Sequence, residues 1–79
     1  MPNELITSSQ RIAAEIRAEM GRQKVSINQL AEEIGMPVTT FRRSVNGDRS
    51  FTLDEFWAIS VALKIDPAAV VAKTTWKAA

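Results

Sequence analysis

The segment that most restricts the possible folds of this chain is residues 26–47, SINQLAEEIGMPVTTFRRSVNG. Ser26 and Gln29 match the pattern of a capping box, which predicts that a helix begins there. Gly35 can adopt the left-handed backbone that ends a helix, and Pro37 suits the first turn of the next helix but not its interior. The segment therefore predicts two short helices joined by a tight turn at residues 35–37.

The rest of the chain also divides into helices. Thr7 with Gln10 and Thr52 with Glu55 are two more capping-box patterns. The β-branched residues never alternate over the length of a strand. We therefore predict an all-α fold of five helices, with these ranges: about 7 to 21 or 24, 26–34, about 37–45, 52–63, and a fifth from 66, where an aspartate cap precedes Pro67.

The apolar residues recur at helical spacing and predict one core. Trp57 lies four residues after Leu53, so we expect it to pack in or beside that core. The residues expected to face inward are Ile12, Ile16, Met20, Leu30, Ala31, Ile34, Phe41, Val45, Leu53, Phe56, Ile59, Leu63 and Val70.

A chain of 79 residues predicts a single domain, residues 1–79, with its core at about 8–72 and a tail at 73–79.

Cysteine and histidine are both absent, so thiolate metal sites and the commonest general base are excluded. Two pairs of neighbouring acidic residues, at 32–33 and 54–55, lie near helix surfaces and a helix start. There they are explained by solvation, capping and the helix dipole rather than by catalysis. We expect no enzyme activity, no cofactor, no metal and no small-molecule ligand.

Localisation is predicted from two features. No apolar run approaches the roughly 20 residues that a membrane span needs. The first ten residues lack the basic-then-apolar order of a signal peptide. We expect a soluble cytoplasmic protein with no membrane partner.

Charge is concentrated rather than abundant. The formal net charge is only +1, yet Arg42, Arg43 and Arg49 fall close together with Asp48 as their single acidic neighbour. Arg42 and Arg43 share the third helix with Thr39, whereas Phe41 and Val45 lie on another face. A short helix with such donors on its polar side fits the major groove of DNA.

The chain resembles the Cro/CI-type (λ-repressor-like, XRE-like) helix-turn-helix regulators over roughly residues 8 to 72. The resemblance is carried by Ser26, Leu30-Ala31, Gly35, Phe41 and Asn46-Gly47, and continues through Thr52-Leu53-Asp54, Ile59, Ala62-Leu63, Ile65 and Pro67. It implies a five-helix DNA-binding domain whose helix-turn-helix lies in the second and third helices. It also implies a transcriptional repressor of the phage or bacterial type. Such a repressor is expected in the cytoplasm of a bacterial or phage-infected host cell.

Three positions depart from the family pattern. Ile27 stands where the family often has a glutamine that touches the DNA backbone, a role that Asn28 can take over. Val38 offers a base only apolar contact, such as to a thymine methyl. Ser44 replaces a large apolar residue, so looser packing is expected there.

The expected DNA contacts form two groups. Base contacts are assigned to Val38, Thr39, Thr40, Arg42 and Arg43. Backbone contacts are assigned to Ser26, Asn28, Gln29, Asn46, Arg49 and Ser50, where the last three resemble the family's second backbone clamp and Arg49 is expected to contact a phosphate rather than a core partner.

A second surface predicts a protein partner. Ala58 and Val61 face away from the expected core, and with Val71 and Trp76 they predict an apolar patch for homodimerisation. The alternative is that the C-terminal tail covers this patch within one chain.

The expected function is operator occupancy by a repressor on double-stranded DNA. The alternatives are an antitoxin-type DNA-binding regulator and a protein-interaction module that kept the fold.

Overall fold

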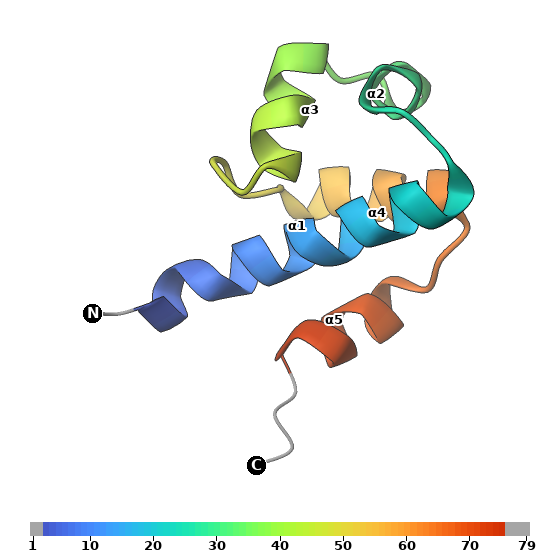
Figure 1. Cartoon of the computed structure of the whole chain (residues 1–79). Helices are drawn as coiled ribbons and strands as arrows, with labels where there is room; N and C mark the ends of the chain where they lie inside the picture. Colours follow the sequence, from blue (N-terminus) through green and yellow to red (C-terminus); the bar gives the residue numbers. More distant parts are fainter. Residues whose placement is uncertain (1–2, 76–79) are drawn as a thin grey trace.

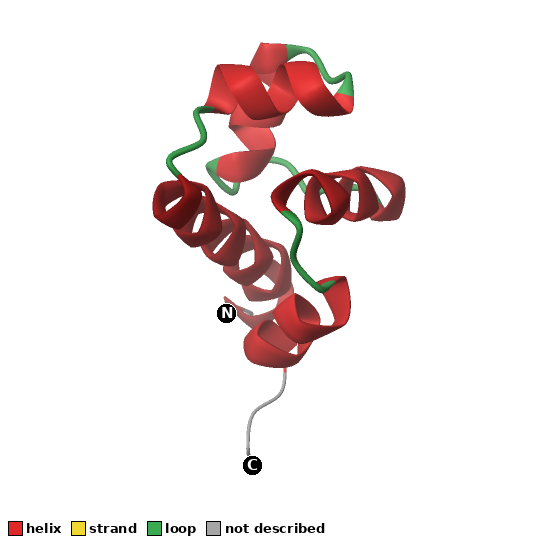
Figure 2. Cartoon of the chain, turned by 90° about the vertical axis from the view of Figure 1, so that its right-hand side faces the viewer, coloured by secondary structure: helices red, strands yellow, loops and turns green. Residues whose placement is uncertain are grey.

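A computed structural model describes residues 3–75, with the surroundings of the side chains given for residues 9–74. The described chain is helical, without a strand (Figures 1 and 2). Its helices are α1 (Asn3–Gln23), α2 (Ile27–Ile34), α3 (Val38–Val45), α4 (Leu53–Leu63) and α5 (Pro67–Thr75). The predicted all-α, five-helix fold is confirmed.

The long helix α1 crosses the molecule and organises the others around it. It contacts α3, α4 and α5, while α2 packs on α3 and α4. In Figure 1, α2 and α3 lie together on one side of α1 and α5 lies on the other. The helix-turn-helix pair therefore forms one end of the molecule, supported from below by α1 and α4.

Two of the three predicted capping boxes are present. At α2, Ser26 Oγ accepts the Gln29 N–H at 3.1 Å, and Gln29 Oε1 accepts the Ser26 N–H at 2.8 Å. At α4, Thr52 Oγ1 accepts the Glu55 N–H at 3.1 Å and Glu55 Oε1 accepts the Thr52 N–H at 2.9 Å. Each box pairs two backbone donors that a helix start otherwise leaves unsatisfied.

The third box, at Thr7, is wrong. Helix α1 already begins at Asn3, so Thr7 lies inside it. No glycine or proline separates residues 3 and 7, and nothing there stops the helix from extending toward the N-terminus. At its other end α1 passes Gly21 and ends at Gln23, with Lys24 in the left-handed region at φ 57°.

The core agrees with the prediction at most positions. Its buried side chains come from all five helices: Ile16, Met20, Leu30, Ala31, Phe41, Val45, Phe56, Ile59, Leu63 and Val70. Ile12 and Ile34 are partly buried against this cluster. The buried serine Ser60 donates its hydroxyl to the carbonyl of Phe56 at 2.9 Å, which satisfies it within its own helix.

Two predictions for α4 are wrong. Leu53 is 73% exposed and Trp57 is 58% exposed. Leu53 is the first residue of α4. It lies about one turn before Phe56, which is the first residue of that helix to be buried. Trp57 follows Phe56 directly, so it is turned by about 100° from it and leaves the buried face.

The first residues that the sequence assigned to the tail, 73–75, are helical. Helix α5 continues to Thr75, and Thr74 is buried. Arg11 Nη1 of α1 donates to the carbonyl of Thr74 at 3.1 Å. Thr74 is therefore held against α1.

Candidate nucleic-acid interface

Helix α3 has one face in the core and one face outside. Phe41, Ser44 and Val45 are buried, whereas three of the five side chains expected to contact bases, Thr39, Arg42 and Arg43, are exposed. The other two candidates differ. Thr40 is half-buried, and Val38 is half-buried against the core.

The turn between α2 and α3 fixes the angle of α3. Gly35 has φ 77°, the left-handed backbone that the sequence predicted. Its N–H donates to the carbonyl of Glu32 at 3.2 Å, and the Met36 N–H donates to the carbonyl of Ala31 at 2.9 Å. A Cβ at Gly35 would meet nothing within 4 Å, so the backbone angle, and not space, requires glycine there.

The start of α2 presents the first group of expected backbone contacts. Ser26, Asn28 and Gln29 are exposed, and the first turn of α2 carries no acidic residue. The box between Ser26 and Gln29 is electrically neutral, so the positive end of the helix dipole is not cancelled by a local carboxylate. Ile27, in place of the family's glutamine, is half-buried against the core.

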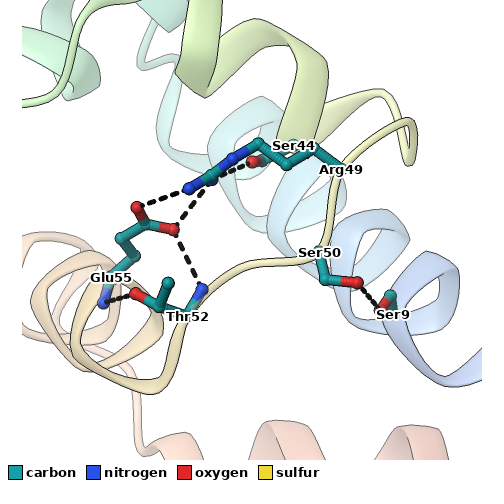
Figure 3. Close-up of polar contacts among 6 residues, drawn as sticks. All are labelled: Ser9, Ser44, Arg49, Ser50, Thr52 and Glu55. Atoms are coloured by element: carbon teal, nitrogen blue, oxygen red, sulfur yellow. Dashed lines mark hydrogen bonds and ion pairs between the residues drawn. The ribbon is translucent and has the colours of Figure 1, made fainter.

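The loop after α3 presents the second group. Asn46 and Ser50 are exposed, and Ser50 Oγ lies 2.8 Å from Ser9 Oγ of α1 (Figure 3). Gly47 has φ 89°, and a Cβ there would lie 3.3 Å from Cγ of Gln10. The loop therefore runs close against α1 and needs glycine at this point.

Arg49 of the same loop points inward. Its Nη1 donates to Ser44 Oγ at 2.8 Å and to Glu55 Oε1 at 2.9 Å, and its Nη2 donates to Glu55 Oε2 at 3.0 Å (Figure 3). The hydrogen bond from Arg49 holds the pKa of Glu55 below its ordinary value, and the same pair raises the pKa of Arg49. The buried hydroxyl of Ser44 thereby has a partner.

The sequence reasoning missed two contacts between separate segments at this end of α3. One is the contact of Arg49 with Glu55 and Ser44; the other joins Arg17 Nη1 of α1 to the carbonyl of Val45 at 2.6 Å. No local sequence pattern predicts either contact, because both depend on how separate segments pack. The six-residue spacing from Arg49 to Glu55 spans a loop, where helical periodicity gives no guide.

The apolar candidates for a dimer interface do not lie in one hollow. Ala58 and Val61 line a shallow depression with Ile34, whereas Val71 lines a groove between α4 and α5 together with Leu53 and Trp57. Trp57 and Val61 are one turn apart on α4, and both are exposed, so they connect the two regions. Trp76, the fourth candidate, lies outside the described residues.

Within residues 3–75, no group of three or more acidic side chains is placed to hold a metal ion. No described helix is both long and apolar enough to cross a membrane.

The profile of the helix-turn-helix family (HTH_3) matches residues 15–70, from the middle of α1 into α5. This chain belongs to that family. The match covers the whole of α2, the Gly35 turn and α3, so it confirms the resemblance to Cro/CI-type regulators. The protein is a helix-turn-helix, DNA-binding transcription regulator. No curated protein and no solved structure matches the chain significantly.

Proposed function

We propose that this helix-turn-helix protein is a sequence-specific repressor of the phage or bacterial type, which acts by occupying an operator in double-stranded DNA. The observation that carries the proposal is the outward face of α3, where Thr39, Arg42 and Arg43 are exposed while Phe41 and Val45 anchor the opposite side. A helix held in this way can enter a major groove without disturbing the core.

The proposed base contacts are made from this face. Arg42 and Arg43 carry the guanidinium forks that pair with the O6 and N7 atoms of guanine. Thr39 and Thr40 supply hydroxyl groups, and Val38, though half-buried, supplies a methyl group at the start of α3.

The proposed phosphate contacts flank the reading helix. Ser26, Asn28 and Gln29 lie at the start of α2, where backbone N–H groups and the helix dipole favour an anion. Asn46 and Ser50 lie in the loop beyond α3. Contacts on both sides of α3 would set its register on the duplex.

Repression by a homodimer is also part of the proposal. Trp57 and Val61 are exposed to an extent unusual for large apolar side chains, which favours a protein partner. A second copy would place two reading helices on half-sites about one helical turn, roughly 34 Å, apart.

Selection from a random pool of duplex oligonucleotides tests the proposal. A repressor of this kind enriches one near-palindromic sequence and binds it less tightly as salt rises, because phosphate contacts release counterions. Failure to enrich any sequence, with binding that does not respond to salt, contradicts DNA reading. The exposed Trp57 would then favour a protein-interaction module, the rival function.

A further inference from the structure

The C-terminal end of α3 is held by two arginines from outside the helix. Arg17 of α1 donates to the carbonyl of Val45, and Arg49 of the following loop donates to the hydroxyl of Ser44. The last carbonyls of a helix lack partners within it and carry negative partial charge. Two guanidinium groups therefore complement the end of α3 that lies farthest from the Gly35 turn.

Arg49 also joins α3 to α4. Both terminal nitrogens of its fork meet the carboxylate of Glu55, and that carboxylate is fixed in turn by the backbone N–H of Thr52. The side chains of Arg49 and Glu55 are only 27% and 20% exposed. As Figure 3 shows, the contacts run continuously from α3 through the loop to the start of α4.

We propose that Arg49, through Ser44 and Glu55, is a positioning residue that sets the orientation of α3, and that it does not contact a phosphate. This inference rests on the proposed role of α3 as the reading helix. It replaces the phosphate contact that the sequence suggested for Arg49, because both ends of its fork are directed at partners within the chain.

A positioning role affects specificity more than general affinity for DNA. Hydrogen bonds to base edges require a defined helix orientation, whereas contacts to phosphates supply most of the sequence-independent binding. Loosening the end of α3 should therefore lower the ratio of specific to non-specific affinity. The salt dependence of binding should stay unchanged, because no phosphate contact is lost.

The test uses Glu55→Gln and Arg49→Gln in the full chain. Glutamine keeps the capping geometry at position 55, as Gln29 does at α2, but removes the ionic partner of Arg49. We expect each variant to lower the ratio of specific to non-specific affinity by about tenfold at an unchanged salt slope. Arg22→Gln is the matched control for Arg49→Gln, because it removes the same charge from an ion pair with Glu19 within α1.

A phosphate contact by Arg49 gives the opposite pattern. Arg49→Gln would then reduce the salt slope by about one and weaken all sequences alike. Glu55→Gln would tighten binding, since it releases Arg49 for DNA. Either result overturns the positioning role.

Hydrogen exchange in the protein without DNA separates this inference from the proposed function. The N–H groups of Asn46 and Asp48 donate to carbonyls of Arg42 and Arg43 at 2.9 and 2.8 Å, so they report on the end of α3. We expect Glu55→Gln to speed their exchange about fivefold or more while the Leu30 amide of α2 is unchanged. Equal rates in parent and variant overturn the inference whether or not the protein binds DNA. Should Glu55→Gln fail to fold, Ser44→Ala, which removes the other partner of Arg49, repeats the measurement.

Discussion

The guanidinium of Arg17 in α1 donates a 2.6 Å hydrogen bond to the carbonyl oxygen of Val45, the last residue of α3. Residues 28 positions apart in the chain are thereby joined at the end of the helix that we propose reads DNA. The start of α3 is fixed by the Gly35 turn, so both ends are tied to the body of the domain. The exposed side chains between them are presented by a helix that is fixed at two points.

Replacing the exposed arginines of α3 should relax base recognition. We expect Arg42→Ala or Arg43→Ala to cost about 1–3 kcal/mol in operator binding, because an arginine forked onto guanine discriminates bases by that amount. Fluorescence anisotropy with the selected operator and with single-base variants measures the change. Arg22→Ala, which removes an equal charge from α1, should have a much smaller effect. If both α3 variants bind as tightly as the parent, the reading face is misplaced.

Gln29→Glu should separate stability from binding. Glutamate also completes a capping box with Ser26, so thermal unfolding should be unchanged or slightly improved. DNA binding should weaken, because the new carboxylate faces the proposed phosphate position. Lys73→Gln on α5 makes the same change in net charge and serves as the control. Equal losses of affinity in the two variants would argue that only total charge matters.

Lys64→Gly should stabilise the fold. Lys64 ends α4 with φ 58°, in the left-handed region where a side chain is unfavourable and glycine is not. We expect a gain of up to about 1 kcal/mol in the free energy of unfolding, measured by urea denaturation. Lys73→Gly lies inside α5 and should instead destabilise by a similar amount. A lower free energy of unfolding for both variants would contradict the left-handed backbone conformation of Lys64.

Val61→Glu should abolish self-association. Val61 is 68% exposed, so a charge there costs the monomer little but would be buried unpaired between two copies. Sedimentation velocity over a range of concentrations should show a dimer for the parent and a monomer for the variant. Ala14→Glu, on an exposed position of α1, should behave as the parent does. Concentration-independent monomer masses for all three proteins would remove the dimer from the proposal.

Acid should weaken the fold partly through Glu55. Its pKa is lowered from the ordinary value of 4.5 chiefly by the hydrogen bond from Arg49, so the folded state favours the charged form. That contribution is complete above the ordinary pKa and is lost as the pH falls through the lower, folded value. Urea denaturation at about pH 5 and about pH 3 should show a smaller loss of stability for Glu55→Gln than for the parent. Equal losses would exclude this carboxylate as a source of acid sensitivity.

The elements that were predictable from sequence are those governed by local chemistry. The boxes at Ser26 and Thr52 and the left-handed turn at Gly35 each depend on residues within a few positions of one another, and all three are present. Thr7 also matches a capping pattern, but the pattern alone cannot show that the preceding residues are helical too.

The other errors and the omissions depend on tertiary structure. Leu53 fits the apolar spacing of α4, yet its exposure depends on where the neighbouring helices end. The contacts of Arg17 with α3 and of Arg49 with Glu55 depend on packing between segments that no periodicity relates. The sequence thus predicted which helix carries the candidate DNA site and which of its faces is polar. It did not predict the residues whose contacts hold that helix in place.

The division of α3 into an anchored face and an outward face has a consequence for retargeting. Positions 39, 42 and 43 are exposed, so a library randomised there should retain the folded domain in most of its members. New operators can then be sought by exchanging these side chains alone, with the scaffold left untouched.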